Sequence, residues 1–407
     1  MVEKNKFTKI ISYMIVIIVL FIFPDNKQKP FDLYNIYIML AFYYMVVVWN
    51  MKRLFFTNFN KILSSYPMFI LVIICILSTI WAQDKKLALL SGLLLLGTTL
   101  YGICLSERFS LGEILDIFVC YFLISAVISL VTAVFIPSMG TFHDTSEGKM
   151  AWIGIYNSRN SLSLNMSFGV LCAYFNLHNK DKKKLLSSVA ALILCCINLV
   201  FSRARTGVIV LIIVFIIIKV WEKRNKYKGF LFIIFSIIGI LAVFNKDILM
   251  NKISAFIGRD LSFSGRTSIW EYCIEAVKIR PLLGYGYNSF WIDKWDSQAN
   301  FIRFQLNFKE LMSAHNGYIG IMLDIGIIGL AIYLVTIFYC LYRALKKFKT
   351  TDNMIEIMPV VSVVFILFYN FSEQMLLKPC SIFWLIQVIA YAKTMEKDEK
   401  KNAILNN

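Results

Sequence analysis

Apolar stretches of membrane-spanning length follow one another along almost the whole chain, with mostly short polar segments between them. A helix of about 17 to 25 apolar residues crosses the roughly 30 Å hydrocarbon core of a bilayer. Such stretches lie at residues 7–23, 33–49, 66–82, 87–105, 111–136, 159–177, 185–201, 206–221, 228–245, 314–342, 354–371 and 380–395. The pattern predicts an all-α fold, a polytopic membrane helix bundle with about twelve spans.

One polar interval, residues 246–312, is far longer than the others and is rich in Trp, Phe and Ile. Loops of this length are usually functional or disordered, and the aromatic content argues against disorder. Its stretch "GRTSIWEYCIEAVKIRP" predicts an amphipathic helix that begins after Gly265 and ends before Pro281. We expect this helix to lie at the membrane interface or to cover the outer mouth of the bundle. Its polar stripe contains Thr267, Glu271, Glu275 and Lys278, and its apolar side Ile269, Trp270, Cys273, Ile274 and Val277.

Basic residues orient the predicted bundle. Lysine and arginine are concentrated at the N-terminus, in alternate loops and in the C-terminal tail, which places both termini in the cytoplasm and residues 246–312 outside. The first apolar stretch has no small-residue cleavage site after it, so we expect a retained helix. The expected organisation is a membrane bundle over 1–245, a large extracytoplasmic loop over 246–312, membrane spans over 313–395 and a cytoplasmic tail over 396–407.

Composition agrees with a membrane protein, because 58% of the residues are hydrophobic and only 16% are charged, against about a quarter charged in soluble domains. The net charge of +17 is explained by basic loops that face anionic lipid headgroups, so no nucleic-acid partner is needed. The nine cysteines lie mostly within apolar stretches without the spacing of metal ligands. We interpret them as small apolar residues.

Arginine departs from the orientation that lysine follows. On the predicted topology, the arginines that face outward are Arg159, Arg203, Arg205, Arg259, Arg266, Arg280 and Arg303. A planar guanidinium binds phosphate or carboxylate through two points, which suits an anionic lipid headgroup and above all a diphosphate. Ordinary solvation or pairing with nearby carboxylates is the alternative for any one of them. Arg203 and Arg205 are stronger candidates, because "FSRARTGVIV" holds them in a tight turn between apolar spans.

Four motifs in order resemble the O-antigen ligase and polymerase family of bacterial envelope enzymes. They are "SRARTG" at the head of a span, "SGRTSIW" in the long loop, "PLLGYGYNSF", and "AHNGYIGIMLDIGIIGL" at the end of that loop. The resemblance implies a multi-span glycosyltransferase of the bacterial cytoplasmic membrane. Such an enzyme moves a saccharide from undecaprenyl diphosphate to a hydroxyl of an acceptor glycan or lipid on the outer face. It implies catalytic roles for Arg205, Arg266 and His315.

The residues themselves agree with this chemistry. Negative charge develops on the departing diphosphate, and the outer loops hold no DxD motif, so we expect a metal-independent enzyme without cofactors in which Arg205 and Arg266 bind the diphosphate. Arg203 and Arg159 are further substrate-binding candidates. His315 is expected to accept the proton of the incoming hydroxyl, although an isolated histidine is more often structural. Asn316 is expected to act in substrate binding, where it orients a sugar hydroxyl or the His315 imidazole, or else to cap a helix.

Several assignments remain open from the sequence. Asp324 is expected to pair with another group or to contact the acceptor, His143 to be structural or to touch substrate, and Gly320, Gly326 and Gly329 to allow close helix packing. A lipid-linked oligosaccharide flippase or another transporter is the alternative function, and it should show broken or charged helices near mid-membrane. A non-catalytic assembly protein is a third. The motifs do not separate a polymerase from a ligase.

Overall fold

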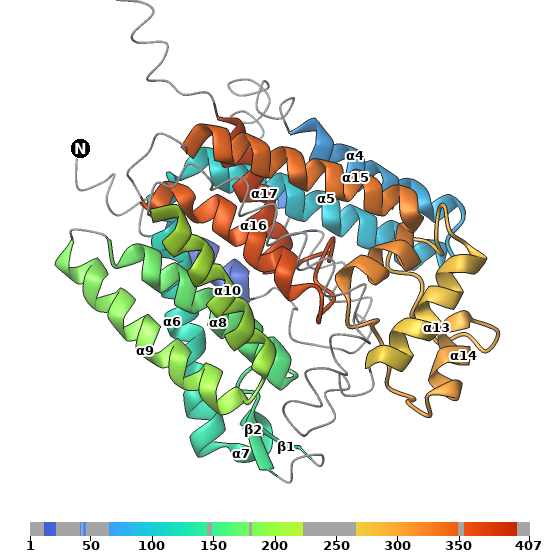
Figure 1. Ribbon diagram of the computed structural model, residues 1–407, viewed down its shortest axis with the longest axis horizontal. Helices are drawn as coiled ribbons and strands as arrows, with labels where there is room; N and C mark the ends of the chain where they lie inside the picture. The colour runs from blue at the N-terminus through green and yellow to red at the C-terminus, as the bar shows by residue number, and fades with distance from the viewer. Residues whose placement is uncertain are drawn as a thin grey trace, which may run out of the picture.

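The computed structural model describes residues 12–21, 41, 44, 45, 65–144, 149–178, 181–222, 266–348 and 354–396. The described part is mainly helical (Figure 1). Of the predicted spans, 228–245 and nearly all of 33–49 lie outside the described residues, as do residues 246–265 of the long loop and nearly all of the tail.

The helices follow the apolar stretches closely. An unlabelled helix covers Ser12–Phe21. The labelled elements are α4 (Tyr66–Leu77), η2 (Ser78–Ile80), α5 (Lys85–Arg108), α6 (Leu111–Phe135), α7 (Pro137–Gly140), β1 (Thr141–Asp144), β2 (Lys149–Trp152), α8 (Arg159–Asn176), α9 (Lys182–Ser202), α10 (Arg205–Glu222), α13 (Arg266–Ile279), α14 (Gln298–Gln305), α15 (Gly317–Phe348), η3 (Met354–Ile357), α16 (Met358–Tyr369) and α17 (Ile382–Met395).

Short polar residues fix where the long helices begin. The Asp84 carboxylate accepts from the Leu87 N–H at the start of α5, and Ser110 and Glu113 form a reciprocal capping box at the start of α6. The side chains of Ser158 and Ser381 each accept a hydrogen bond from a backbone N–H at the starts of α8 and α17. Such caps satisfy N–H groups that would otherwise lack partners.

Among the helices that the structure describes, four are long and apolar enough to cross a membrane, namely α5, α6, α9 and α15. The helix Ser12–Phe21, α4 with η2, η3 with α16, and α17 are shorter apolar helices. The described helices therefore show a membrane protein, and the twelve spans stay a prediction. Many side chains of the long helices point outward although they are apolar, among them Ile193 on α9 and Val335 on α15, as expected where a surface meets lipid.

The bundle has two neighbouring groups of helices (Figure 1). α8 packs against α6 and α9 on one side, and α5 packs against α4 and α17 on the other. α16 connects them, because it packs against both α10 and α17. Their buried side chains form one continuous apolar core.

A two-stranded antiparallel sheet departs from the all-α prediction. β1 and β2 pair from Thr141 opposite Trp152 to Asp144 opposite Lys149, within the segment that connects α6 to α8. The Trp152 ring stacks on Phe201 at the end of α9, with ring centroids 4.5 Å apart. The hairpin is thereby attached to the end of the bundle where α9 turns into α10.

The described part of the long loop, residues 266–312, folds around an apolar core of its own. α13 begins and ends where the sequence predicts, and Ile269, Trp270, Cys273 and Val277 are buried on one side. Ile274 is exposed instead, whereas Ala276 is buried. This core also receives side chains from α14, which the sequence analysis did not predict, and from the first turns of α15.

The segment that follows α13 inserts its backbone into a break in α15. Ile325 and Gly326 have non-helical dihedral angles, so α15 consists of a short first part and a long second part. The Tyr285 N–H donates to the Leu323 carbonyl (2.8 Å), and the Ile327 N–H donates to the Pro281 carbonyl (2.8 Å). Backbone groups released by the break thus find partners in "PLLGYG".

This break corrects the role expected for Gly326. The sequence analysis assigned it to close helix packing, but its φ is +73° and a Cβ would lie 2.0 Å from the Leu282 carbonyl oxygen. Gly284, opposite it in "PLLGYG", has φ +65° and equally close backbone neighbours. Glycine is required at both positions because only glycine allows this conformation and this backbone contact together.

Candidate active site

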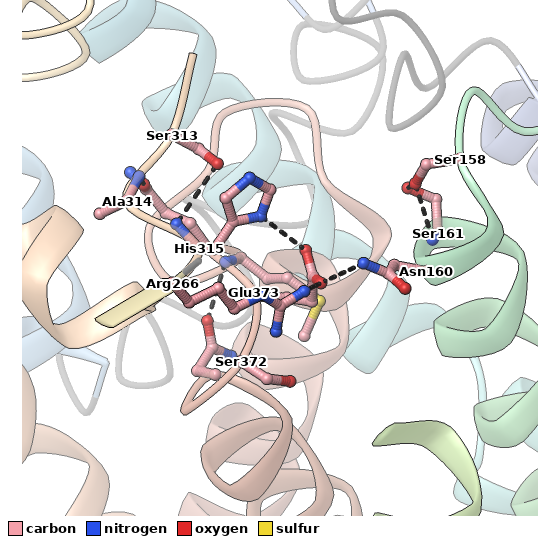
Figure 2. A network of polar contacts seen from close by, with 12 residues as sticks. Ser158, Asn160, Ser161, Arg266, Ser313, Ala314, His315, Ser372 and Glu373 are labelled. Carbon is pink, nitrogen blue, oxygen red and sulfur yellow. Dashed lines mark hydrogen bonds and ion pairs between the residues drawn. The ribbon is translucent and has the colours of Figure 1, made fainter. Parts of the chain in front are cut away.

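Four elements that are far apart in the sequence bring polar side chains to one end of the bundle (Figure 2). Arg266 begins α13, His315 lies two residues before α15, Asn160 lies in the first turn of α8, and Glu373 lies between α16 and α17. Glu373 is the residue that contacts the other three. The structure therefore places two of the predicted catalytic residues, Arg266 and His315, beside one carboxylate.

The Glu373 carboxylate uses its two oxygens differently. Oε1 accepts from Arg266 Nη2 at 2.8 Å and from Asn160 Nδ2 at 2.9 Å. Oε2 lies 3.6 Å from His315 Nδ1. The Arg266 and Glu373 side chains are only 13% and 17% exposed, so their attraction is screened less by solvent than that of a surface pair.

His315 has a left-handed backbone conformation, with φ +48°. The residue before it is held from two sides, because the Trp270 Nε1–H donates to the Ala314 carbonyl and the Ala314 N–H donates to Gln374 Oε1. After it, the Gly317 N–H donates to the Asn370 carbonyl. The tertiary contacts of α13 and of the α16–α17 link thus determine where the imidazole lies.

Asn316 caps α15, which is the second of the two roles that the sequence allowed. Its Oδ1 accepts from the N–H groups of Tyr318 (3.0 Å) and Ile319 (3.2 Å), and the residue is buried. The oxygen of this amide is thereby occupied by the helix. Substrate binding by Asn316 stays a prediction.

The other arginine candidates lie at the same end of the bundle. Arg203 has φ +54° at the end of α9, Arg205 begins α10, and both are exposed. The turn between them touches α8, since Ser163 Oγ donates to the Ala204 carbonyl at 3.3 Å. Because Ser163 follows Asn160 by about one helical turn, α8 connects this turn to the Glu373 cluster. Arg159 is half-buried beside Asn160.

Glu373 and Asn160 are the residues of this cluster that the sequence analysis missed. A signal was present for Glu373, because on the predicted topology it is a carboxylate in the short outer link between the last two apolar stretches. An outer carboxylate opposite outer arginines indicates pairing, but the sequence does not say which arginine is reached. Asn160 had no signal beyond its position in a polar segment.

The remaining sequence candidates lie elsewhere or outside the description. His143 is on the exposed strand β1, and Arg259 lies outside the described residues. Asp324 is next to the break in α15, where its carbonyl accepts from the Gly286 N–H. Within the described ranges, no group of three or more His, Cys, Asp or Glu side chains could hold a metal ion. Metal independence stays a prediction.

Arg303 has structural partners in the described part of the chain, and they are mainly backbone carbonyls instead of the carboxylates named as the alternative for outward arginines. It is buried on α14, and its guanidinium donates to the carbonyls of Leu311, Ile292 and Trp291 as well as to Asn300 Oδ1. Burial lowers the pKa of this guanidinium, and Asp293 opposes the shift. Five donors in a fixed plane are needed to satisfy these scattered acceptors.

Arg303→Lys is expected to destabilise the folded segment 266–312 by about 2 to 4 kcal/mol, because buried carbonyls lose their donors. The measurement is the rate at which a protease cleaves residues 280–312 in the detergent-solubilised protein. Lys294→Ala is the control, since Lys294 pairs with Asp296 in the exposed part of the same segment, and exposed pairs contribute at most about 1 kcal/mol. Equal cleavage rates in both variants would contradict a structural role for Arg303.

Comparisons with known proteins agree with the motif order. Residues 190–334 match the family model described as O-Antigen ligase. The exopolysaccharide production protein ExoQ of Rhizobium meliloti is 24% identical over 337 residues, which are 79% of this chain and 76% of the relative. The matched region contains Arg203, Arg205, Arg266 and His315, whereas Asn160 and Glu373 lie outside it.

Two shorter similarities point the same way. The putative polysaccharide ligase RP358 of Rickettsia prowazekii is 29% identical over 105 residues, 26% of this chain and 24% of the relative. The putative polysaccharide ligase RT0347 of Rickettsia typhi is 30% identical over 94 residues, 23% of this chain and 22% of the relative. Together with the apolar helices, these similarities confirm the resemblance seen in the sequence: this membrane protein is similar to the O-antigen ligase family, and the family model matches it over residues 190–334.

Proposed function

We propose that this protein transfers a saccharide from undecaprenyl diphosphate to a hydroxyl group of an acceptor glycan or lipid. The observation that carries the proposal is the position of Arg266 and His315 on either side of Glu373 at one end of an apolar bundle. A cation for a diphosphate and a group that accepts a proton are the two requirements of this transfer. The similarity to the O-antigen ligase family supports it.

In the proposed mechanism, the acceptor oxygen attacks the anomeric carbon while the bond from that carbon to the diphosphate oxygen breaks. The bonding electrons leave with the diphosphate, and Arg266 and Arg205 stabilise its charge, assisted by Arg203 and Arg159. His315 takes the proton of the acceptor hydroxyl. Attack from the side opposite the leaving group inverts the anomeric centre, and the step needs neither a metal ion nor another cofactor.

The proposed setting is the cytoplasmic membrane of a bacterium, with both termini in the cytoplasm and the Glu373 cluster on the outer face. The distribution of lysine supports this orientation. The helix ends support it as well, because the starts of α8, α10 and α13 and the end of α16 lie together, away from the lysine-rich start of α9. Membrane lipids, the lipid-linked donor and the acceptor are then the partners.

A flippase or other transporter is the second candidate, and one observation favours it: α15 is a broken helix with Asp324 at the break. Discontinuous helices often form the substrate sites of transporters. Here, however, residues 281–286 fill the break and take up its backbone hydrogen bonds. A transferase therefore accounts for more of the described contacts.

The test is reconstitution of the full chain with an undecaprenyl-diphosphate-linked oligosaccharide, without nucleotide sugar and with a metal chelator. A product ladder on a gel is expected for a polymerase, and a single new product that requires an added acceptor for a ligase. Movement of the donor across the bilayer without a new glycosidic bond would contradict the proposal and favour a transporter.

A further inference from the structure

The Glu373 carboxylate is shared between two groups to which the proposed mechanism gives different tasks. Arg266 and Asn160 both bind Oε1, whereas Oε2 faces His315. Figure 2 shows the carboxylate between the guanidinium and the imidazole. A change at Arg266 can therefore alter the position of the carboxylate that faces the His315 imidazole.

The contact between Glu373 and His315 is too long to be a hydrogen bond. His315 Nδ1 lies 3.6 Å from Oε2, beyond hydrogen-bond length, and it is a buried atom without a hydrogen-bond partner. A buried polar nitrogen that lacks a hydrogen-bond partner is unfavourable for the folded state. A carboxylate shift of less than about 1 Å would bring Nδ1 within the usual range of 2.7 to 3.2 Å.

Glu373 is the side chain that can make this movement. The backbone around His315 is fixed on both sides, by the hydrogen bonds to Ala314 and by those of Asn316 and Gly317. The short ion pair between Arg266 and Glu373 Oε1 holds the carboxylate away from His315. Whatever weakens that pair allows the carboxylate to approach His315.

We propose that Glu373 is a positioning residue whose carboxylate moves from Arg266 toward His315 when a lipid diphosphate binds Arg266. This inference rests on the proposed function, in which Arg266 binds the donor diphosphate. A diphosphate carries more negative charge than a carboxylate and competes for the same guanidinium. Asn160 keeps its bond to Glu373 and holds the side chain within reach of the imidazole.

The consequence for the chemistry follows from the two imidazole nitrogens. A carboxylate that accepts from the His315 Nδ1–H fixes the tautomer in which Nε2 has a free lone pair, and it stabilises the imidazolium that forms when Nε2 takes a proton. The acceptor hydroxyl is then activated only when the donor is in place. Donor binding and base positioning become one coupled event.

The chain is suited to a spectroscopic test because it contains three histidines, His143, His178 and His315. The full protein, labelled with ¹⁵N in histidine, is studied in lipid nanodiscs before and after addition of undecaprenyl diphosphate without a sugar. The signals are assigned from single histidine variants. Binding itself is followed separately by ³¹P NMR of the lipid, and undecaprenyl monophosphate and phosphatidylglycerol serve as lipid controls.

We expect undecaprenyl diphosphate to convert His315 to the Nδ1–H tautomer with a low-field, hydrogen-bonded proton, and to leave the signals of His143 and His178 unchanged. Glu373→Gln should bind the lipid but lose the change at His315, whereas Glu373→Asp should retain part of it. In the transfer assay, Glu373→Gln should lower kcat by roughly 10²- to 10⁴-fold and change the donor KM much less.

Each other outcome counts against the inference in a distinct way. Lipid binding without a change at His315, or with the same change in Glu373→Gln, would overturn the movement of the carboxylate and leave the proposed function standing. Absence of any lipid binding to the wild-type protein would overturn both. Unchanged signals of the two other histidines exclude unfolding of the variant as the cause of a lost response.

Discussion

His315→Asn is expected to reduce saccharide transfer by about 10²- to 10⁴-fold, the usual contribution of a general base. Asparagine is chosen because it tolerates the left-handed conformation of this position, where φ is +48°. The substitution therefore removes the imidazole with little added backbone strain. The measurement is the initial rate in the reconstituted system, together with the thermal unfolding midpoint of the same preparation.

His178→Asn is the matched control. His178 lies in the link between α8 and α9, is exposed, and contacts only the Tyr174 carbonyl and ring among the described contacts. Its substitution should leave the rate within about twofold, as for surface substitutions with effects below about 0.5 kcal/mol. A His315→Asn protein with an unchanged midpoint and nearly full activity would show that His315 is structural.

Gly326→Ala is expected to destabilise the folded protein by about 2 to 6 kcal/mol. An alanine held at φ +73° and ψ −174°, a backbone region almost restricted to glycine, costs about 1 to 3 kcal/mol of strain. Displacement of the Leu282 carbonyl, which lies 2.0 Å from the position of the new Cβ, adds about 1 to 3 kcal/mol of overpacking. The inserted segment would be forced out of the break in α15, so the first part of this helix, which follows His315, should lose its position.

The unfolding midpoint in detergent measures this effect, and Gly112→Ala provides the control. Gly112 lies in the first turn of α6, and a Cβ there would meet nothing within 4 Å. Because alanine is the better helix former by about 1 kcal/mol, Gly112→Ala should be neutral or slightly stabilising. Equal midpoints for Gly326→Ala and Gly112→Ala would mean that the "PLLGYG" insertion contributes little to stability.

The helices were the most predictable part of the fold, for a local reason. An apolar run such as residues 111–136 determines a long helix by itself, and the described α6 covers nearly the same residues. The same is true of α13, whose pattern of apolar and polar positions gave its bounds. The α14 helix was missed because it buries Arg303 and exposes Phe304, which inverts the usual pattern.

Two members of the Glu373 cluster were among the residues that the sequence singled out. Arg266 and His315 were recognised from residue type and from the resemblance, and the structure brings them to one carboxylate. Glu373 could not be assigned from the sequence because its partner Arg266 lies 107 positions earlier in the chain and on a different helix. A single sequence contains no measure of distance between such elements.

The sequence by itself determined that this is a helical membrane protein and that four of its motifs, in order, resemble the O-antigen ligase family. Length and polarity along the chain are local properties, so they can be read without knowledge of the fold. Only the tertiary structure decided that α15 is broken, that "PLLGYG" fills the break, and that Glu373 lies between Arg266 and His315. These features depend on hydrogen bonds between distant backbones and side chains, which form only once the helices have packed.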